Sequence, residues 1–158
     1  MTRAHIFQIN ASKGGVPKLP LAEGQVTREG LVGDRQRDRR HHGGVQRALC
    51  LFPLEEILAL QHEGHPIYPG AIGENVTIAG LDWHKIVPGV ALQLGSEVRV
   101  RITAYAHPCS NIKAAFADGN INHVSAKKTP ERARVYACIL RAGVIRPGDV
   151  VTFIEEVA

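Results

Sequence analysis

The chain has 158 residues, of which 44% are hydrophobic and 22% charged, and its formal net charge is +4; this balance is ordinary for a soluble globular protein and fits one domain over residues 1–158. Three cysteines without a C-x-x-C pair argue against a disulfide framework or a zinc site, so we expect a reducing, cytoplasmic compartment. The apolar stretch 4–9 is too short and too polar for a secretory signal, and no stretch approaches a membrane span, so no membrane partner is expected.

The first half of the chain predicts short strands separated by loops rich in glycine and proline. Residues Thr2–Ile9 form the first expected strand, and Gln25–Val32 form the second. A long polar loop begins at Gly33, and the apolar run Arg47–Phe52 that follows it predicts a third strand.

The clearest predicted helix is Leu54–His62. Pro53 suits the first helical turn, two glutamates complement the helix dipole there, and Gly64 ends the helix. The apolar residues share one stripe, so this helix is expected to cover the sheet and to be structural.

The second half of the chain continues the pattern of short strands. A glycine-rich loop, 68–73, leads into an expected strand at Glu74–Ala79. Many short strands with two small helices and no βαβ rhythm predict a mainly β fold, namely a closed or nearly closed antiparallel β-barrel with a few short helices. The further expected strands are 86–94, 98–105, 133–140 and 145–153, two of which contain Pro-Gly turns.

Cys109 carries the strongest chemical signal. It lies in Pro108-Cys109-Ser110-Asn111, between the strand 98–105 and a short helix expected at 112–117. Ser110 or Asn111 can cap that helix, and a thiol beside a helix N-terminus ionises more readily because it feels the positive end of the backbone dipole. A thiolate is both a nucleophile and a soft metal ligand. The alternative is a buried cysteine in a turn.

The surroundings of Cys109 differ from those of the other two cysteines. Cys50 and Cys138 lie inside apolar strands, where a free cysteine is usually an inert, small hydrophobic residue. His107 lies two residues before Cys109, on the same face if the strand continues, so it can help to ionise the thiol or donate a proton. An exposed histidine without a chemical role is the alternative.

The segment Gly33–Gly44 is rich in arginine, histidine and glycine. Guanidinium groups are planar forks of donors that suit phosphate or carboxylate oxygens, and adjacent glycines let backbone N–H groups approach a ligand. This composition predicts a site for an anion of limited size, and a solvated basic loop is the alternative. The adjacent His41 and His42 point opposite ways on an extended segment and indicate a metal site only weakly. Nucleic acid is not expected, because the loop has no interleaved aromatic residues for base stacking.

A third signal is the loop Gly70–Thr77. Two glycines flank apolar residues, and the polar Glu74 and Asn75 follow at the mouth of a strand. Such a loop can present backbone groups to a ring system, or it can be a tight corner in which Asn75 bonds its own backbone.

Taken in order, these segments resemble the MOSC domain, named from the C-terminal part of molybdenum cofactor sulfurases. The resemblance implies a β-barrel that binds the molybdenum cofactor (molybdopterin), and, at the level of the family, pyridoxal phosphate binding. One departure is Ala106-His107, where many relatives carry an arginine shortly before the Pro-Cys pair. The matching pieces are Gly33-Asp34-Arg35, His42-Gly43-Gly44 with the strand Arg47–Phe52, Gly73–Thr77 with Gly80-Leu81, and Leu94-Gly95 leading to Pro108-Cys109.

The resemblance also implies roles for individual residues. Cys109 corresponds to the family's cysteine that ligates molybdenum or carries sulfur, and His107 is a possible proton donor. Characterised relatives reduce N-hydroxylated bases and amidoximes. The residues expected to bind the cofactor are Arg35, Arg40, His42, Gly43, Gly44, Arg47, Gly73, Glu74 and Asn75.

The expected partners are a small-molecule substrate and a separate electron-donor protein, because the chain has neither an iron–sulfur cysteine cluster nor a dinucleotide fingerprint. A sulfur carrier or cofactor-handling module with a persulfide on Cys109, and a non-enzymatic anion-binding protein, are the alternative functions. The oligomeric state stays open.

Overall fold

The structure is a computed structural model that describes residues 3–35 and 44–155. Three residues expected to bind the cofactor, Arg40, His42 and Gly43, lie outside the described residues.

In the described part of the chain, the strands form an eight-stranded sheet in the order β11-β7-β8-β9-β5-β6-β1-β2 and a three-stranded sheet in the order β10-β3-β4. Neighbouring strands are antiparallel except for β5 and β6, which are parallel. The mainly β class is therefore confirmed. The strands are β1 (His5–Ala11), β2 (Leu19–Leu21), β3 (Gly24–Thr27), β4 (Gly30–Leu31), β5 (Leu49–Pro53), β6 (Val76–Ala79), β7 (Ala91–Leu94), β8 (Val98–Tyr105), β9 (Val135–Arg141), β10 (Gly143–Ile145) and β11 (Val151–Ile154).

One α-helix, α1 (Leu54–His62), is present in the described residues, at the predicted position. Glu55 and Glu56 lie in its first turn, as the sequence predicted, whereas Pro53 is the N-cap residue, directly before that turn. No helix among the described residues is long and apolar enough to cross a membrane. The 3-10 helices are η1 (Val45–Arg47), η2 (Trp83–Lys85), η3 (Ser110–Ala115), η4 (Ile121–Val124) and η5 (Pro130–Arg132).

The sheets do not close into the expected barrel. Residues 9–11 of β1 pair with β2, so only the start of β1 is left to meet the segment before β11. That meeting consists of one isolated bridge, His5 to Val150, and a few backbone hydrogen bonds such as the one from Ile6 N to Asp149 O at 2.9 Å. The Pro147-Gly148 turn is itself part of this contact, since Gly148 N donates to Ile6 O at 2.7 Å, and the contact does not extend into a ladder between β1 and β11 in the described chain.

The expected single strand Gln25–Val32 is instead a hairpin of β3 and β4. Gly30 has a φ of +124° and lies against the carbonyl of Ala48, a conformation and a contact that leave no room for a side chain. The chain therefore reverses at residues 28–29.

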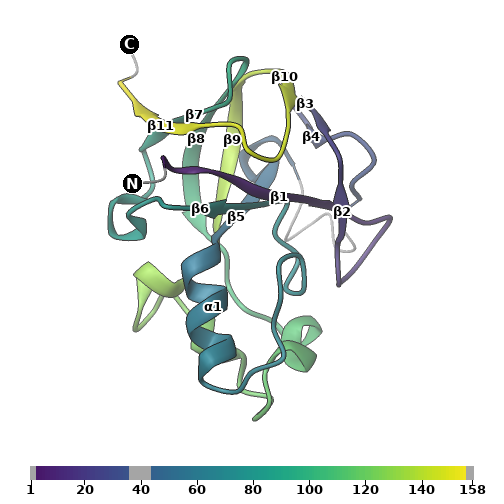
Figure 1. Cartoon of the computed structure of the whole chain (residues 1–158), viewed down its shortest axis with the longest axis vertical. Coiled ribbons are helices and arrows are strands. Elements are labelled where there is room, and N and C mark those ends of the chain that lie inside the picture. Colours follow the sequence, from purple (N-terminus) through teal and green to yellow (C-terminus); the bar gives the residue numbers. More distant parts are fainter. Residues whose placement is uncertain (1–2, 36–43, 156–158) are drawn as a thin grey trace.

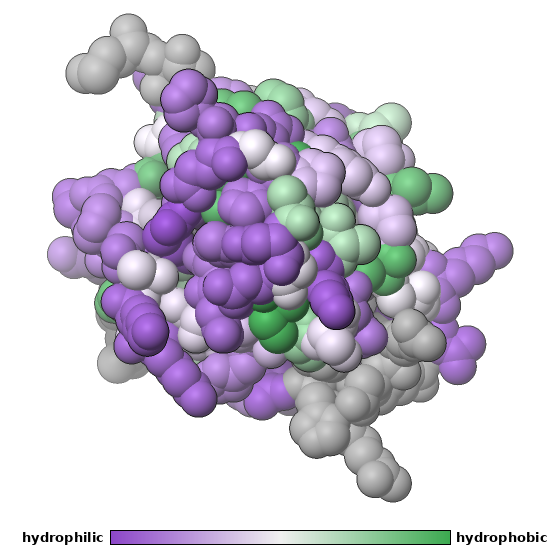
Figure 2. Space-filling view, turned by 90° about the horizontal axis from the view of Figure 1, so that it is seen from below, coloured by the Kyte–Doolittle hydropathy of each residue, from purple (hydrophilic) through white to green (hydrophobic). Residues whose placement is uncertain are grey.

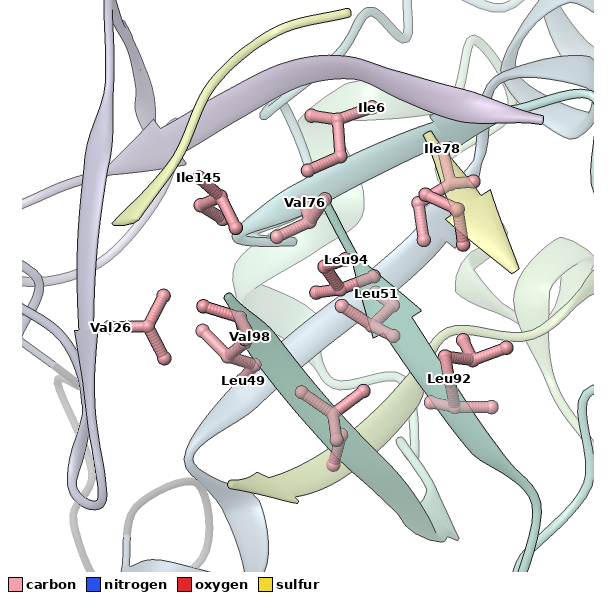
Figure 3. Close-up of a cluster of buried hydrophobic side chains, with 14 of the residues drawn as sticks. Ile6, Val26, Leu49, Leu51, Val76, Ile78, Leu92, Leu94, Val98 and Ile145 are labelled. Carbon is pink, nitrogen blue, oxygen red and sulfur yellow. The ribbon is translucent and has the colours of Figure 1, made fainter. Parts of the chain in front are cut away.

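The two largest clusters of buried hydrophobic residues among the described residues hold the fold together. The larger one fills the space between the strands, where Ile6, Leu49, Val98 and Ile145 point toward one another (Figure 3). Each such fully buried aliphatic side chain stabilises the fold by about 1.5–3 kcal/mol relative to an exposed one.

The second cluster fixes the part of the chain that follows Cys109. It joins Ile57 and Leu60 of α1 to Ile112 and Phe116 of the connection between β8 and β9. In Figure 1, α1 and this connection lie below the strands, and Figure 2 shows that this end of the molecule has a largely hydrophilic surface. The segment carrying Cys109 is thus anchored on the helix.

Candidate functional site

A cleft of about 520 Å³, part of it open to solvent, contains Cys109 in its wall. It forms where the loop after β1, the segment after β4, the strand β5 and the 72–73 loop meet the start of η3 and of β9. Three cationic side chains also line it, namely Lys18, Arg35 and Arg134.

Cys109 itself is half-buried and directly precedes η3. The expected cap by Ser110 or Asn111 is wrong, because the N-cap residue is Cys109 and no side chain caps this end of η3. The carbonyl of Cys109 accepts a hydrogen bond from Ile112 N at 3.2 Å, which fixes its backbone. Cys109 therefore lines the cleft with part of its surface open to solvent.

Cys50, expected to be an inert hydrophobic residue, also lines the cleft. Burial raises the pKa of its thiol to about 11, so Cys50 is protonated at neutral pH. All five residues of β5 are buried, and an apolar run of this kind does not show which side chains face a cleft.

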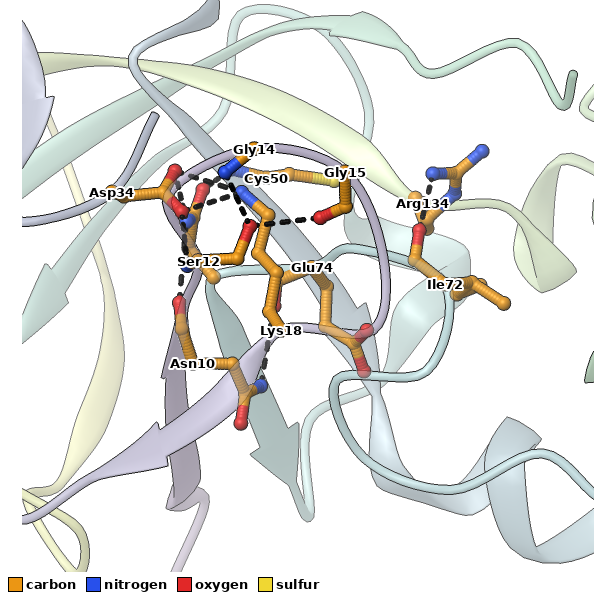
Figure 4. Close-up of polar contacts among 11 residues, drawn as sticks. Asn10, Ser12, Gly14, Gly15, Lys18, Asp34, Cys50, Ile72, Glu74 and Arg134 are labelled. Atoms are coloured by element: carbon orange, nitrogen blue, oxygen red, sulfur yellow. Dashed lines mark hydrogen bonds and ion pairs between the residues drawn. The ribbon is translucent and has the colours of Figure 1, made fainter. Parts of the chain in front are cut away.

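A buried network of polar side chains fixes the floor of the cleft (Figure 4). Lys18 Nζ donates to the two Asp34 oxygens at 2.7 and 2.9 Å, and both side chains are about 95% buried. Asn75 Nδ2 donates to Asp34 at 2.9 Å, while Asn75 Oδ1 accepts from Cys50 N at 2.9 Å. Asn75 therefore links separate elements, and the alternative of a corner in which it bonds its own backbone is wrong.

Arg134 connects two walls of the cleft. Its guanidinium donates to Ile72 O at 2.8 Å and to His107 O at 3.5 Å, and the residue is 7% exposed. Its Nε has no hydrogen-bond partner among the described residues. No pattern in the sequence indicates this role, because an arginine at the start of a strand is usually a solvated residue.

Tyr136 contributes a hydroxyl group to the cleft. Burial raises the pKa of Tyr136 to about 12, and the neighbouring Cys50 acts in the same direction. The guanidinium of Arg47 lies 5.4 Å from the centre of the tyrosine ring, within the range of a cation–π contact.

The predicted site residues are only partly brought together. Cys109, Arg35 and Gly73 line the cleft, and Arg47 contacts it through Tyr136. The remaining described residues lie outside its lining. Gly44 precedes η1, Glu74 and Asn75 are fully buried, and His107 is exposed and is not among the residues that line the cleft.

Glu74 is enclosed behind the cleft and not presented to it. Thr77 Oγ1 donates to one carboxyl oxygen at 3.1 Å, and the other oxygen has no partner among the described residues. Burial raises the pKa of this carboxyl group above its usual value.

The donor set of the cleft is an accessible thiol, a protonated thiol, a hydroxyl and several cations. An accessible thiol suits a soft metal, and guanidinium groups suit the oxygens of an anion. A ligand that carries both a soft metal and an anionic group would therefore contact both the thiol and the guanidinium groups of the cleft.

A family model described as MOSC domain matches residues 38–152 of the chain. The uncharacterized protein YflK of Bacillus subtilis is 29% identical over 136 residues, which cover 85% of this chain and 60% of YflK. The protein YiiM of Escherichia coli is 31% identical over 129 residues, which cover 79% of this chain and 54% of YiiM. The chain thus spans less than two thirds of the length of these relatives.

Solved structures show the same fold. The crystal structure of YiiM from Geobacillus stearothermophilus has a TM-score of 0.75 at 24% identity and covers 96% of this chain and 75% of that one. The YUAD protein from Bacillus subtilis has a TM-score of 0.75 at 18% identity and covers 96% and 94% of the two chains.

Proposed function

The chain belongs to the MOSC domain family, and on that premise we propose that it binds the molybdenum cofactor at the Cys109 cleft and reduces N-hydroxylated compounds. The observation that carries this proposal is the accessible Cys109 thiol in a cleft that also holds Arg35 and Arg134.

The residues of the cleft fit the chemistry of this cofactor. A cysteine thiolate is a soft ligand that suits molybdenum, so Cys109 would hold the metal. Arg35 is exposed at the cleft and would bind the phosphate through its planar donors. Gly73, with a φ of +91°, would present its backbone to the pterin. Lys18 is engaged by Asp34, so this lysine of the cleft offers pyridoxal phosphate no free amine.

When bound, the cofactor would supply the redox and oxygen-transfer chemistry, and a separate donor protein would supply the electrons. The chain's own residues would hold the segment that carries Cys109 in place and would give a proton to the substrate. Arg134 holds the His107 carbonyl and thereby the segment that leads to Cys109. The exposed His107 ring is the proposed proton donor to the substrate. Tyr136 keeps its proton at neutral pH, because burial raises the pKa of its hydroxyl to about 12.

The test is metal analysis of the full chain purified from a host that makes the cofactor. We expect molybdenum in the wild-type protein and in Cys138→Ala, because Cys138 lies in β9 and does not line the cleft. We expect its loss in Cys109→Ala. Reduction of an amidoxime with an artificial electron donor should follow the metal content. A wild-type protein without molybdenum, or equal retention by Cys109→Ala, would overturn the proposal.

A sulfur carrier with a persulfide on Cys109 is the second candidate, because it needs the same accessible thiol. Mass spectrometry distinguishes the two functions. A labile sulfur adduct on Cys109, in protein without molybdenum or reductase activity, would favour the carrier.

A further inference from the structure

A second hollow adjoins the Cys109 cleft. Its volume is about 460 Å³, including the part that is open to solvent. It shares Val16, Asn111 and Ile112 with the cleft, so the two spaces are direct neighbours. We call it the apolar hollow, and its walls include Val16, Pro17, Pro66, Tyr68, Ile112 and Ala114.

The chemistry of the apolar hollow differs from that of the cleft. Among the described residues that line the hollow, none is charged, and the polar side chains are Asn111 and the hydroxyl of Tyr68. The cleft, in contrast, holds three cationic side chains. A pterin ring has many hydrogen-bonding groups that would lose water without gaining partners here. The hollow therefore suits an uncharged, apolar group.

The walls of the hollow are held in place by contacts outside it. Ile112 is 3% exposed and belongs to the core cluster beneath, against which Val16 also packs. The backbone N–H of Lys18 donates to Gly70 O at 2.9 Å, which ties the Val16–Pro17 wall to the loop on the far side. Gln61 Nε2 donates to Ile67 O at 2.8 Å and fixes the stretch between Pro66 and Tyr68. The hollow is thus preformed, which lowers the entropic cost of binding.

We propose that the apolar hollow binds the uncharged apolar substituent of a substrate whose reacting end lies at Cys109. The identity of the reacting end, an N-hydroxylated group, rests on the proposed function. The hollow itself selects substrates with an aryl or branched alkyl substituent over those with a methyl group. Burial of a phenyl ring predicts a preference of roughly 10- to 50-fold.

The test compares Ala114→Trp with Ala117→Trp. Both alanines are exposed and belong to the same segment, but only Ala114 lines the hollow. A tryptophan at 114 fills the hollow, whereas the same substitution at 117 adds equal bulk outside it. Matching urea unfolding midpoints would show that both variants fold.

The first measurement needs no cofactor and no turnover. Iodoacetamide labelling of Cys109 is followed by mass spectrometry with benzamidoxime or acetamidoxime present at equal concentration. We expect benzamidoxime to slow the labelling at least 5-fold more than acetamidoxime in the wild type and in Ala117→Trp. This difference should disappear in Ala114→Trp. Equal protection by the two compounds, or a difference that survives in Ala114→Trp, would overturn the inference.

The second measurement is the ratio of kcat/KM values for the same two compounds in molybdenum-loaded protein. A ratio near one in the wild type would overturn the inference while leaving the reductase proposal intact. Selective protection of Cys109 without any turnover would support the hollow and count against the reductase.

Discussion

Replacing Lys18 with methionine should weaken the fold more than a single lost ion pair on the surface would. Lys18 and Asp34 form a buried pair with Nζ to Oδ2 at 2.7 Å, and their side chains are 6% and 5% exposed. Removing one partner of a buried pair costs about 3–5 kcal/mol, because the remaining charge is left without compensation. Ser12 N and Asn75 Nδ2 still donate to Asp34 at 3.0 and 2.9 Å, so we expect the lower end of this range, about 3 kcal/mol.

Urea unfolding followed by circular dichroism measures this loss as the change in the free energy of unfolding. A matched control is Arg146→Met, because Arg146 and Glu23 form a pair whose side chains are both 60% exposed. That substitution should cost no more than about 1 kcal/mol.

A double-mutant cycle with Asp34→Asn isolates the interaction itself. The double variant should lose about 2 kcal/mol less than the sum of the two single losses, because residues in one network are coupled. The reasoning would be refuted if Lys18→Met cost no more than Arg146→Met, or if the two single losses added without coupling.

Three further outcomes follow from individual residues. Gly73→Ala should destabilise the fold more than Gly148→Ala does. Both glycines have a φ of +91°, but of these two only a Cβ at Gly73 would meet a neighbour, Val16 Cγ1 at 3.1 Å. Thermal unfolding of the two variants measures the difference in stability, which we put at about 1 kcal/mol. Cys50 should react with iodoacetamide only slowly at pH 7, and its rate should rise about 10-fold per pH unit toward its pKa of about 11; mass spectrometry reads each site, and fast labelling of Cys50 at pH 7 would contradict its burial. Glu74→Gln should remove a pH dependence of the stability. Folding raises the pKa of Glu74 above 4.5, so the unfolded chain releases this proton more readily than the folded protein does. Wild-type stability therefore falls as the pH rises through and above 4.5. Urea midpoints between pH 4 and pH 8 test this, and parallel curves for the two proteins would refute it.

Local signals in the sequence predicted the local parts of the fold. The helix α1 was confirmed because its proline, glutamates and apolar stripe act within one or two turns. The strand β8, Val98–Tyr105, was confirmed because its β-branched residues alternate from Val98 to Ile102. The hairpin of β3 and β4 was missed, since the contact that demands Gly30 comes from Ala48, far along the chain.

The candidate site was predictable only where the residue type and its sequence neighbours indicate a chemical role. Cys109, Arg35 and Gly73 were identified by residue type and neighbours, and the structure places all three around one cleft. Arg134 and Cys50 were missed, because a strand pattern does not show which wall a side chain faces or which distant carbonyl accepts its hydrogen bond. The open sheet could not be predicted either. It depends on one edge of β1, where the last residues pair with β2 and the first residues meet only the segment before β11.

The cleft draws on residues 15–18, 35, 50, 72–73, 109–112 and 134–136, which are spread over most of the chain. Arg134 and Tyr136 belong to the last of these segments, at the start of β9, and β9 sits between β5 and β8 in the sheet. A nascent chain on the ribosome that ends before β9 lacks Arg134 and Tyr136, so its cleft is incomplete. Loading of any ligand there must therefore wait until synthesis has passed the ninth strand and the sheet has assembled around it.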